Sequence, residues 1–293
     1  MMRVLVTGST GQLGSEVVRM MQAGGHEVIA PLSEELDFLQ PAAVAGWTRE
    51  IGADWVINCA AYTQVDKAES EEHQAFIINR DSAGALAGAV AEYGGRLLHV
   101  STDYVFDGTQ SRPYREDDTP NPVGIYGRSK YEGEAAVQAA LPGATILRTA
   151  WVYGVRGHNF VKTIVRAAIA GKPLRVVDDQ IGSPTWTRDI ANAIKVLVDR
   201  DIGGVFHFTS AGNTSWYGFA AAILEDASRE GFALVTDKVE PIPTSAWPTA
   251  AARPAYSVLD TQKIREILDS PIPDWRDSLK SMLGELYSCA DCW

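Results

Sequence analysis

The chain has little cysteine and no long apolar run. Only three of its 293 residues are cysteine, too few for a disulfide framework, so a reducing cytoplasm is the expected location. No uninterrupted apolar stretch approaches the roughly 20 residues of a membrane span. The first strand pattern begins at Arg3, so we expect no signal peptide ahead of it. These absences argue against a secreted or membrane-spanning protein.

Positive charge is also scarce. Lysine and arginine number 26 against 37 aspartate and glutamate residues, which gives a formal net charge of −11. No basic stripe of the kind that holds nucleic acid is visible, and the same balance argues against binding to a membrane surface. One local arginine or lysine could still hold a small anionic ligand. The 46% hydrophobic and 22% charged residues are ordinary for a globular protein and exclude disordered, collagen-like and coiled-coil chains.

Short apolar runs alternate with longer amphipathic stretches in the first half of the chain. The runs are continuous, as expected of parallel strands that are buried on both faces. Such strand–helix–strand repetition predicts an α/β fold of the Rossmann type, with a doubly wound parallel sheet. The predicted strands are residues 3–7, 28–32, 55–60, 97–101 and 145–150, and the predicted helices are residues 12–23, 41–51, 71–93 and 129–140.

The second half is less regular and predicts a smaller C-terminal substrate-binding domain. Its predicted helices are residues 160–170, 189–198, 216–228 and 275–287, and its predicted strands are residues 174–177 and 205–209. The change of pattern predicts a dinucleotide-binding domain at residues 1–155 and a mainly substrate-binding domain at residues 156–293. We expect residues 186–202 to return to the first domain.

A glycine-rich segment follows the first predicted strand and opens the first predicted helix. It reads T-G-S-T-G-Q-L-G, with Gly8, Gly11 and Gly14 in G-x-x-G-x-x-G spacing. Backbone N–H groups of such a turn approach a pyrophosphate closely, and the helix N-terminus adds partial positive charge. The alternative is a merely tight turn, but the place of the segment in a strand–helix–strand chain favours a dinucleotide site.

The segment after the second predicted strand normally selects between NADH and NADPH. It reads A-P-L-S at residues 30–33, with neither an acid for the adenosine ribose nor an arginine for a 2′-phosphate. Asp37 and Phe38 follow and could bracket the adenine, although Asp37 could equally cap the helix that begins at Pro41. We therefore expect that both NADPH and NADH are used.

Three polar side chains predict a proton-transfer site. Tyr126 and Lys130 are spaced to project from one face of a helix. A phenol has an ordinary pKa of about 10, which a neighbouring ammonium lowers. Thr102 follows a predicted strand, at the sheet edge where α/β proteins bind ligands. Tyr126 would then donate a proton to a carbonyl oxygen that Thr102 holds, as hydride reaches the carbon. Asn79 could hold a relay water or, equally, cap a neighbouring turn.

These motifs resemble the extended short-chain dehydrogenase/reductase family and, within it, the dTDP-4-dehydrorhamnose reductases. The resemblance runs over almost the whole chain, and S-T-D-Y-V-F, R-T-x-W-V-Y and D-Q-x-G-x-P-T are its most specific motifs. It implies NAD(P)H-dependent reduction of the C4 keto group of a dTDP-linked 4-keto-6-deoxysugar, dTDP-4-dehydro-L-rhamnose, for cell-surface polysaccharide synthesis. The alternatives are a reductase of another nucleotide-linked 4-keto sugar and a non-catalytic NADP-binding regulatory subunit.

The resemblance also implies roles for individual residues. It places cofactor contacts at Gly8, Gly11, Gln12, Leu13, Gly14, Asp37, Phe38, Ala61, Tyr62, Thr63, Val100, Tyr126 and Lys130. It places substrate contacts at Thr102, Asp103, Tyr126, Trp151, Asn159, Gln180 and Arg253, and catalysis at Thr102, Tyr126 and Lys130. Trp151 would pack against the deoxysugar, although its place after a strand also suits core packing. Arg253 would hold the substrate diphosphate, with a surface salt bridge as the alternative.

Some members of this family dimerise around magnesium that clustered glutamates hold. Glu16 and Glu285 fall at two such positions, but the third falls near Thr187–Asp189, where no glutamate stands. We therefore expect no bound metal, and a monomer or a homodimer built on other contacts. Cys289 and Cys292 form a C-x-x-C pair in the terminal tail, which we expect to be unordered and to serve neither zinc nor redox chemistry.

Overall fold

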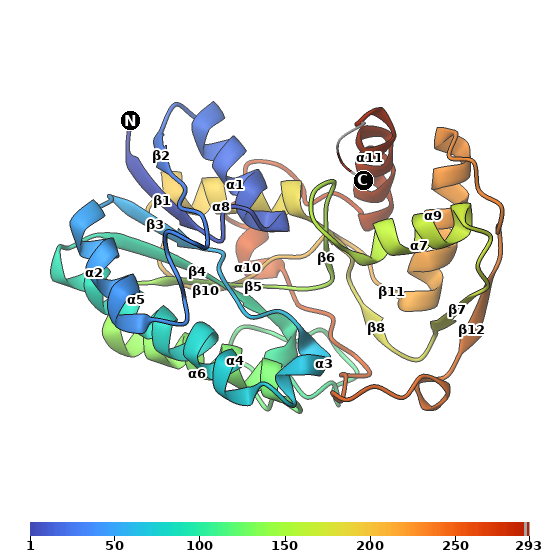
Figure 1. The fold of residues 1–293 in the computed structure, drawn as a ribbon, viewed down its shortest axis with the longest axis horizontal. Coiled ribbons are helices and arrows are strands. Elements are labelled where there is room, and N and C mark those ends of the chain that lie inside the picture. Colours follow the sequence, from blue (N-terminus) through green and yellow to red (C-terminus); the bar gives the residue numbers. More distant parts are fainter. Residues whose placement is uncertain (290–291, 293) are drawn as a thin grey trace.

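A six-stranded parallel sheet forms one of two lobes in the computed structural model, which describes residues 1–289 and 292 (Figure 1). Its strand order is β10-β5-β4-β3-β1-β2. The chain starts at β1, adds β2 on one side and β3 on the other, so the crevice between β1 and β3 is the switch point where such sheets bind ligands. The strands are β1 (Arg3–Thr7), β2 (Glu27–Ile29), β3 (Trp55–Asn58), β4 (Arg96–Thr102), β5 (Thr145–Thr149) and β10 (Gly204–His207).

Helices cover both faces of this sheet. Successive strand residues point to opposite faces, so Val4 and Val6 pack under one helical layer and Leu5 under the other. The first layer holds α1 (Gln12–Ala23), α8 (Thr187–Asp199) and the short α10 (Gln262–Arg265). The second layer holds α2 (Pro41–Ile51), α5 (Ser82–Glu92) and α6 (Ile125–Ala140). The predicted doubly wound parallel sheet is confirmed.

The chain returns to the sheet after residue 186. Helix α8 packs against α1, and β10 pairs with β5 as the edge strand. The returning segment therefore extends beyond residue 202 and includes most of the strand predicted at residues 205–209. A short apolar run does not indicate which sheet it joins, because pairing depends on distant residues. The division of the chain near residue 155 stays a prediction.

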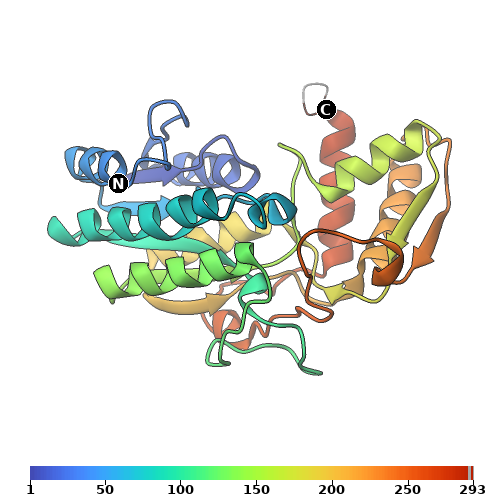
Figure 2. The same cartoon turned by 60° about the horizontal axis from the view of Figure 1, so that its bottom comes forward.

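The second lobe is mainly helical (Figures 1 and 2). Helices α7 (Phe160–Ile169), α9 (Trp216–Glu230) and α11 (Trp275–Ser288) share an apolar core around Phe219. Four short pieces flank these helices as two strand pairs. They are β7 (Leu174–Val177) with β12 (Val239–Ile242), and β8 (Ile181–Gly182) with β11 (Thr214–Ser215). A third pair, β6 (Val152–Tyr153) with β9 (Thr185–Trp186), follows the end of β5 and precedes α8.

The helix predicted at residues 71–93 is divided. It consists of α4 (Glu72–Phe76), a π-helical turn η1 (Ile77–Asp81) and α5. A π turn holds one more residue than an α turn and commonly marks a functional site. Asn79 lies inside this turn and is buried. Three other short elements complete the chain: α3 (Val65–Ala68) and the 3₁₀ turns η2 (Asp103–Val105) and η3 (Thr244–Ala246).

The end of the chain departs from the predicted unordered tail. The structure joins Cys289 and Cys292 by a disulfide, and both side chains pack against the core of the second lobe. The tail prediction is therefore wrong for these two residues, since α11 delivers Cys289 to an apolar surface. Residues 290–291 and 293 lie outside the described residues. Along the described part of the chain, no helix has both the length and the apolar character needed to cross a membrane.

Candidate active site

One cavity of about 1090 Å³ runs from the switch point of the sheet to the second lobe. Segments after β1, β2, β3, β4 and β5 line it, together with the first turn of α6. Sixteen of the predicted site residues line this one cavity: Gly8, Gly11, Gln12, Leu13, Gly14, Asp37, Phe38, Ala61, Thr63, Val100, Thr102, Asp103, Tyr126, Lys130, Trp151 and Asn159. The structure does not place Tyr62, Gln180 or Arg253 on its wall.

The glycine loop fits a dinucleotide pyrophosphate. Gly8 has a φ of +65°, and a Cβ there would lie 2.7 Å from the Ala60 nitrogen. A Cβ on Gly14 would lie 2.1 Å from the Gly8 oxygen, so both positions require glycine. The N-cap of α1 is Gly11, which has no side chain to bond the N–H groups of the first turn. These N–H groups are a site for an anion. The buried Gln12 Oε1 has no hydrogen-bond partner among the described residues, and its contact with the cofactor stays a prediction.

Asp37 does not cap α2, whose N-cap is Gln40 without a capping side-chain hydrogen bond, and its contact with the adenine stays a prediction. It lines the cavity, and its Oδ1 and Oδ2 accept hydrogen bonds from Leu39 N (2.8 Å) and Gln40 Nε2 (3.1 Å) ahead of α2. The bond from the Leu39 amide, with that from Gln40, lowers the pKa of this carboxyl. Glu35 accepts from Leu32 N at 2.7 Å, so this nearby acid is engaged by backbone.

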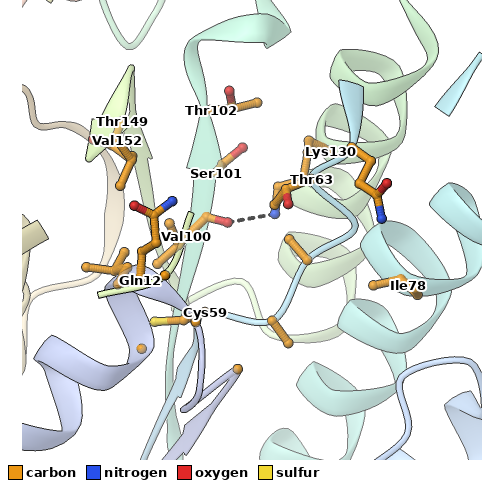
Figure 3. Close-up of a pocket in the computed structure, with 18 of the residues that line it drawn as sticks. Gln12, Cys59, Thr63, Ile78, Val100, Ser101, Thr102, Lys130, Thr149 and Val152 are labelled. Carbon is orange, nitrogen blue, oxygen red and sulfur yellow. Dashed lines mark hydrogen bonds between the residues drawn. The ribbon is translucent and has the colours of Figure 1, made fainter. Parts of the chain in front are cut away.

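The three predicted catalytic side chains face the cavity from β4 and α6. Thr102 ends β4, where its Oγ1 donates to Asp103 Oδ1 (3.0 Å) and accepts from Tyr104 N (3.2 Å). Tyr126 lies in the first turn of α6, and its ring meets that of Tyr104 edge-on at 5.5 Å. Lys130 lies one turn later, and its Nζ donates to the Val100 carbonyl at 2.7 Å (Figure 3). The arrangement places a hydroxyl, a phenol and an amine around one space.

Burial sets the acidity of Tyr126. It raises the pKa of the phenol to about 12, the hydrogen bond with Thr102 lowers that pKa, and the Asp103 charge raises it. The expected lowering of the Tyr126 pKa by Lys130 is wrong for this structure, since Lys130 instead bonds Val100. A phenol with a high pKa remains protonated at neutral pH. It is therefore a proton donor, as the predicted reduction requires.

Two other groups at this edge of the sheet have shifted pKa values. Burial lowers the pKa of Lys130 to about 8, against the opposing charges of Glu134 and Cys59. Burial raises the pKa of Asp103 to about 6, although Ser257 and Thr102 hydrogen-bond to its carboxyl. Groups that titrate near neutrality are typical of catalytic sites.

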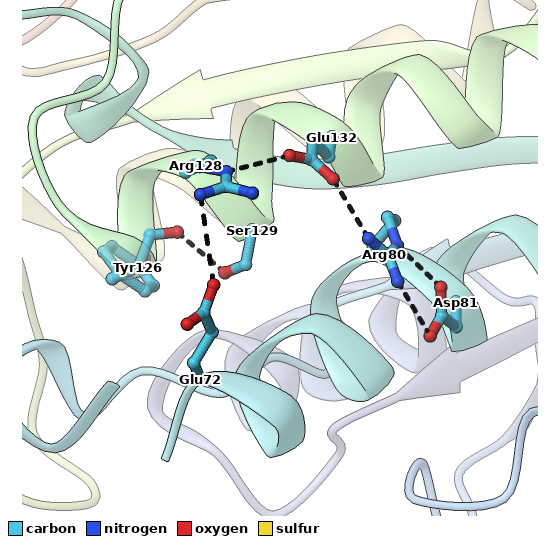
Figure 4. A network of polar contacts seen from close by, with 7 residues as sticks. All are labelled: Glu72, Arg80, Asp81, Tyr126, Arg128, Ser129 and Glu132. Carbon is cyan, nitrogen blue, oxygen red and sulfur yellow. Dashed lines mark hydrogen bonds and ion pairs between the residues drawn. The ribbon is translucent and has the colours of Figure 1, made fainter. Parts of the chain in front are cut away.

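The Glu69 side chain anchors the first turn of helix α6. The Glu69 Oε1 accepts from Ile125 N at 2.8 Å, which caps the helix that carries Tyr126. Glu69 was not predicted as a cap, because its partner Ile125 lies 56 positions away in the sequence. A half-exposed network adds to the anchor: Arg128 and Arg80 both pair with Glu132 at 3.1 Å, and Arg80 also pairs with Asp81 (Figure 4). These pairs join η1 to α6.

Asn79 is a structural clamp. Its Oδ1 accepts from Tyr62 N (2.9 Å), and its Nδ2 donates to Tyr62 O (3.1 Å) and Ser129 Oγ (2.9 Å). The amide is thus engaged by protein atoms, and its role toward a relay water stays a prediction. The clamp turns the Tyr62 side chain away from the cavity, where its hydroxyl donates to Glu71 at 2.6 Å. Ala61 and Thr63 remain on the cavity wall.

Trp151 lies at the second-lobe end of the cavity. Its φ of +45° is unusual for a residue with a large side chain. Its ring stacks on Trp216 with centroids 3.6 Å apart and planes 6° from parallel, and Phe160 packs on Trp216 at 4.7 Å. Trp216 and Phe160 line the cavity and were missed, because only the spatial arrangement brings α7 and α9 to Trp151.

The remaining predicted substrate contacts have other partners. Arg253 forms a two-pronged salt bridge with Asp66, with Nη1 to Oδ1 at 3.0 Å and Nη2 to Oδ2 at 2.7 Å. Gln180 donates from Nε2 to Thr244 Oγ1 at 3.0 Å. Asn159 caps α7 by accepting from Lys162 N at 3.1 Å. The salt-bridge alternative for Arg253 is thus present, and its role toward a diphosphate stays a prediction.

An arginine lies between Glu16 and Glu285, the two glutamates at the positions where some family members hold magnesium. The Arg188 guanidinium lies 2.6 Å from Glu285 Oε2 and 3.8 Å from Glu16 Oε2. Glu16 also pairs with Arg19 at 2.8 Å. Within residues 1–289 and 292, no cluster of three or more histidine, cysteine, aspartate or glutamate side chains could hold a metal ion.

A glycine loop at the start of α1 and a Thr102–Tyr126–Lys130 set in one cavity define a nucleotide-dependent reductase of the extended short-chain type. The chain matches the family described as "RmlD substrate binding domain" over residues 2–288, and it belongs to that family.

Proteins of known name in this family are similar over their whole length. The dTDP-4-dehydrorhamnose reductase of Burkholderia thailandensis is 41% identical over 98% of this chain and 100% of its own. The enzyme of that name from Bacillus anthracis, solved in complex with NADP, is 36% identical with a TM-score of 0.91, over 97% of this chain and 99% of its own. A probable dTDP-4,6-dihydroxy-2-methyloxan-3-one 4-ketoreductase of Streptomyces antibioticus is 40% identical over 98% of this chain and 96% of its own.

Proposed function

We propose that the protein reduces the C4 keto group of dTDP-4-dehydro-L-rhamnose to give dTDP-L-rhamnose, with NADPH as hydride donor and NADH as a second donor. The observation that carries the proposal is the single cavity that joins the glycine loop to Thr102, Tyr126 and Lys130. A purely regulatory subunit has no need of all three side chains. The similarity to dTDP-4-dehydrorhamnose reductases over nearly the full chain supports the nucleotide and the sugar.

Each side chain has a distinct task in this reaction. When bound, the nicotinamide supplies the hydride for the carbonyl carbon. Tyr126 donates its phenolic proton to the keto oxygen, which becomes the C4 hydroxyl. Thr102 hydrogen-bonds that oxygen as negative charge develops on it. Lys130 is the proposed partner of the phenolate that forms at Tyr126, and to reach it the amine must leave the Val100 carbonyl. The buried site excludes water from the proton transfer.

The second lobe is proposed to recognise the sugar nucleotide. The Trp151 indole offers an apolar surface to the 6-deoxysugar at the far end of the cavity. Arg253 would hold the diphosphate, and to do so it must exchange Asp66 for phosphate oxygens. Asp103, Gln180 and Asn159 complete the proposed substrate contacts. We propose a cytoplasmic location and either a monomer or a homodimer.

A reductase of a different dTDP-linked 4-keto sugar is the second candidate. The Streptomyces relative supports it, because its printed name describes another ketoreductase at similar identity. A panel of dTDP-, GDP- and CDP-linked 4-keto sugars, assayed by NADPH oxidation with product analysis, distinguishes the two. We expect the highest kcat/KM for dTDP-4-dehydro-L-rhamnose. A higher value for another sugar would replace the proposed substrate, and no oxidation with any sugar would contradict a reductase.

A further inference from the structure

A chain of buried hydrogen bonds ends on Lys130. It runs from Asn58 at the end of β3 through His99 in β4 to the Lys130 amine. All three side chains are at most 2% exposed, so the direction of each hydrogen bond matters because water cannot correct a mismatch. Asn58 and His99 have no part in the reductase mechanism described above, in which only Lys130 takes a role.

The backbone fixes the orientation of Asn58. Ala60 N lies 3.2 Å from Asn58 Oδ1, and a backbone N–H can only donate. The opposite orientation of the amide would set its NH₂ group against this N–H. Thr7 Oγ1 also donates to the same oxygen at 2.6 Å. Asn58 therefore presents its NH₂ group to His99 Nδ1, 2.9 Å away.

The orientation of Asn58 fixes the tautomer of His99. Nδ1 receives a hydrogen bond, so it carries a lone pair and no proton. Complete burial and the charge of Lys130 keep the pKa of His99 well below its ordinary value, so the ring is neutral. A neutral imidazole without a proton at Nδ1 carries it at Nε2. That N–H faces Lys130 Nζ at 3.3 Å.

The last contact suits a neutral amine better than an ammonium. An ammonium has three donors and no acceptor, so it would meet the Nε2–H of His99 as donor against donor. A neutral amine has a lone pair that accepts this N–H, and it still donates to the Val100 carbonyl at 2.7 Å. The Ala60 N–H orients Asn58, Asn58 sets the tautomer of His99, and the Nε2–H of His99 thus favours loss of the Lys130 proton.

We propose that His99 is a positioning residue which, oriented by Asn58 and the Ala60 amide, sets the pH at which Lys130 loses its proton. Other titratable groups near Lys130 act differently. Glu134 on α6 and Cys59 after β3 both favour its charged form, and Arg148 on β5 pairs with Glu134. Tyr126 shares the helix one turn earlier. Among the described residues, His99 alone directs a donor at the amine. The role of Lys130 itself rests on the proposed function.

The first test reads the tautomer directly. Nitrogen-15 NMR of the histidine-labelled protein separates a protonated from an unprotonated Nδ1, and loss of one signal in His99→Phe assigns it among the five histidines. We expect an unprotonated Nδ1 and a protonated Nε2 at neutral pH in the wild type. A protonated Nδ1 would overturn the proposal. This measurement needs neither cofactor nor sugar, so it stands even where the proposed substrate is wrong.

The second test measures the pH at which Lys130 loses its proton. That pH is taken as the alkaline midpoint of two profiles: NADPH affinity, measured by cofactor fluorescence, and kcat/KM. Asn58→Asp leaves an acceptor for the Ala60 amide but offers an oxygen to His99, so the proton moves to Nδ1 and Nε2 becomes an acceptor. We expect the alkaline midpoint to rise by about one pH unit or more, a tenfold change in the proton dissociation constant. His99→Phe removes the donor and should raise the midpoint as well.

Thr7→Val is the matched control. It removes a hydroxyl from the same buried chain but leaves the Ala60 amide to orient Asn58, so the tautomer and the midpoint should both stay unchanged. An alkaline midpoint that is unchanged in Asn58→Asp, although NMR shows the proton at Nδ1 of His99, would overturn the proposal. A shift in Thr7→Val equal to that in Asn58→Asp would overturn it too. A shift in NADPH affinity without turnover of any sugar would support His99 and contradict only the substrate.

Discussion

The ion pair of Glu134 and Arg148 offers the sharpest test of the energetics behind the site. Both residues are at most 4% exposed, and the guanidinium contacts both carboxylate oxygens at 2.7 to 3.2 Å. His207 Nε2 lies 3.3 Å from Arg148, but burial and the Arg148 charge lower the pKa of His207 to about 3. This neutral ring cannot replace the lost carboxylate. Glu134→Gln therefore leaves a buried, uncompensated cation.

We expect Glu134→Gln to lower the free energy of unfolding by about 3–5 kcal/mol. At about 2–4 °C per kcal/mol, the melting temperature should fall by roughly 6–20 °C. Equilibrium urea unfolding gives the free energy and scanning calorimetry the temperature. The double variant Glu134→Leu with Arg148→Met should recover most of the loss, since it removes both charges and leaves apolar side chains of similar size.

Glu132→Gln on the same helix is the control. Its pairs with Arg80 and Arg128 are half-exposed, and we expect a loss below about 1 kcal/mol. Equal losses for Glu132→Gln and Glu134→Gln would refute the reasoning, because burial would then not set the strength of the pair. So would a double variant less stable than either single one.

Four further outcomes are expected. Tyr126→Phe should lower kcat by about 10²–10⁴-fold with little change in NADPH affinity, whereas Tyr131→Phe on the same helix should leave both unchanged; near-full turnover in Tyr126→Phe would contradict the proton donor. NADPH and NADH should both be used, and a ratio of kcat/KM values beyond about 10³ would refute this expectation. Activity and sedimentation should be unchanged by EDTA, because an arginine stands between the two glutamates; a loss that magnesium restores would reveal a metal contact. Activity should fall on acidification with a midpoint near 6 as Asp103 takes up its proton, and Asp103→Asn should flatten this limb. Because burial raises the Asp103 pKa, the native state binds this proton more readily than the unfolded chain, so this group makes the protein more stable as the pH falls through that range. The free energy of unfolding, measured across the same pH range, should therefore not fall together with the activity.

Local patterns predicted the sheet lobe well. Helices α1 and α2 begin and end where the sequence predicted them, because glycine or proline marks their first turns and an apolar stripe runs through each. Continuous apolar runs predicted five strands, since residues such as Val4 and Leu5 are buried on opposite faces. The placement of β10 depended on pairing with β5, about 60 residues earlier, and no local signal carries that information.

The predicted site residues come together in the structure where one motif supplies a residue and its surroundings, and their roles stay predictions. The glycine loop and the Thr102–Tyr126–Lys130 set lie in the same cavity. What could not be predicted were partners from distant segments. Arg253 pairs with Asp66, 187 positions away, and Trp151 stacks on Trp216. The Tyr126 pKa also depends on burial, which a residue spacing does not reveal.

The π turn at Ile77–Asp81 has a consequence for how this helix can vary among relatives. A π turn amounts to one residue inserted into an α-helix, and its removal restores a continuous ladder with α4 and α5 still in phase. A relative one residue shorter here would therefore keep the helix and its packing on α6. It would lose the outward turn that delivers Asn79 to Tyr62, and with it the fixed path of residues 61–63 along the cavity wall. The one extra residue of this turn, rather than the composition of the helix, therefore fixes where Asn79 meets Tyr62.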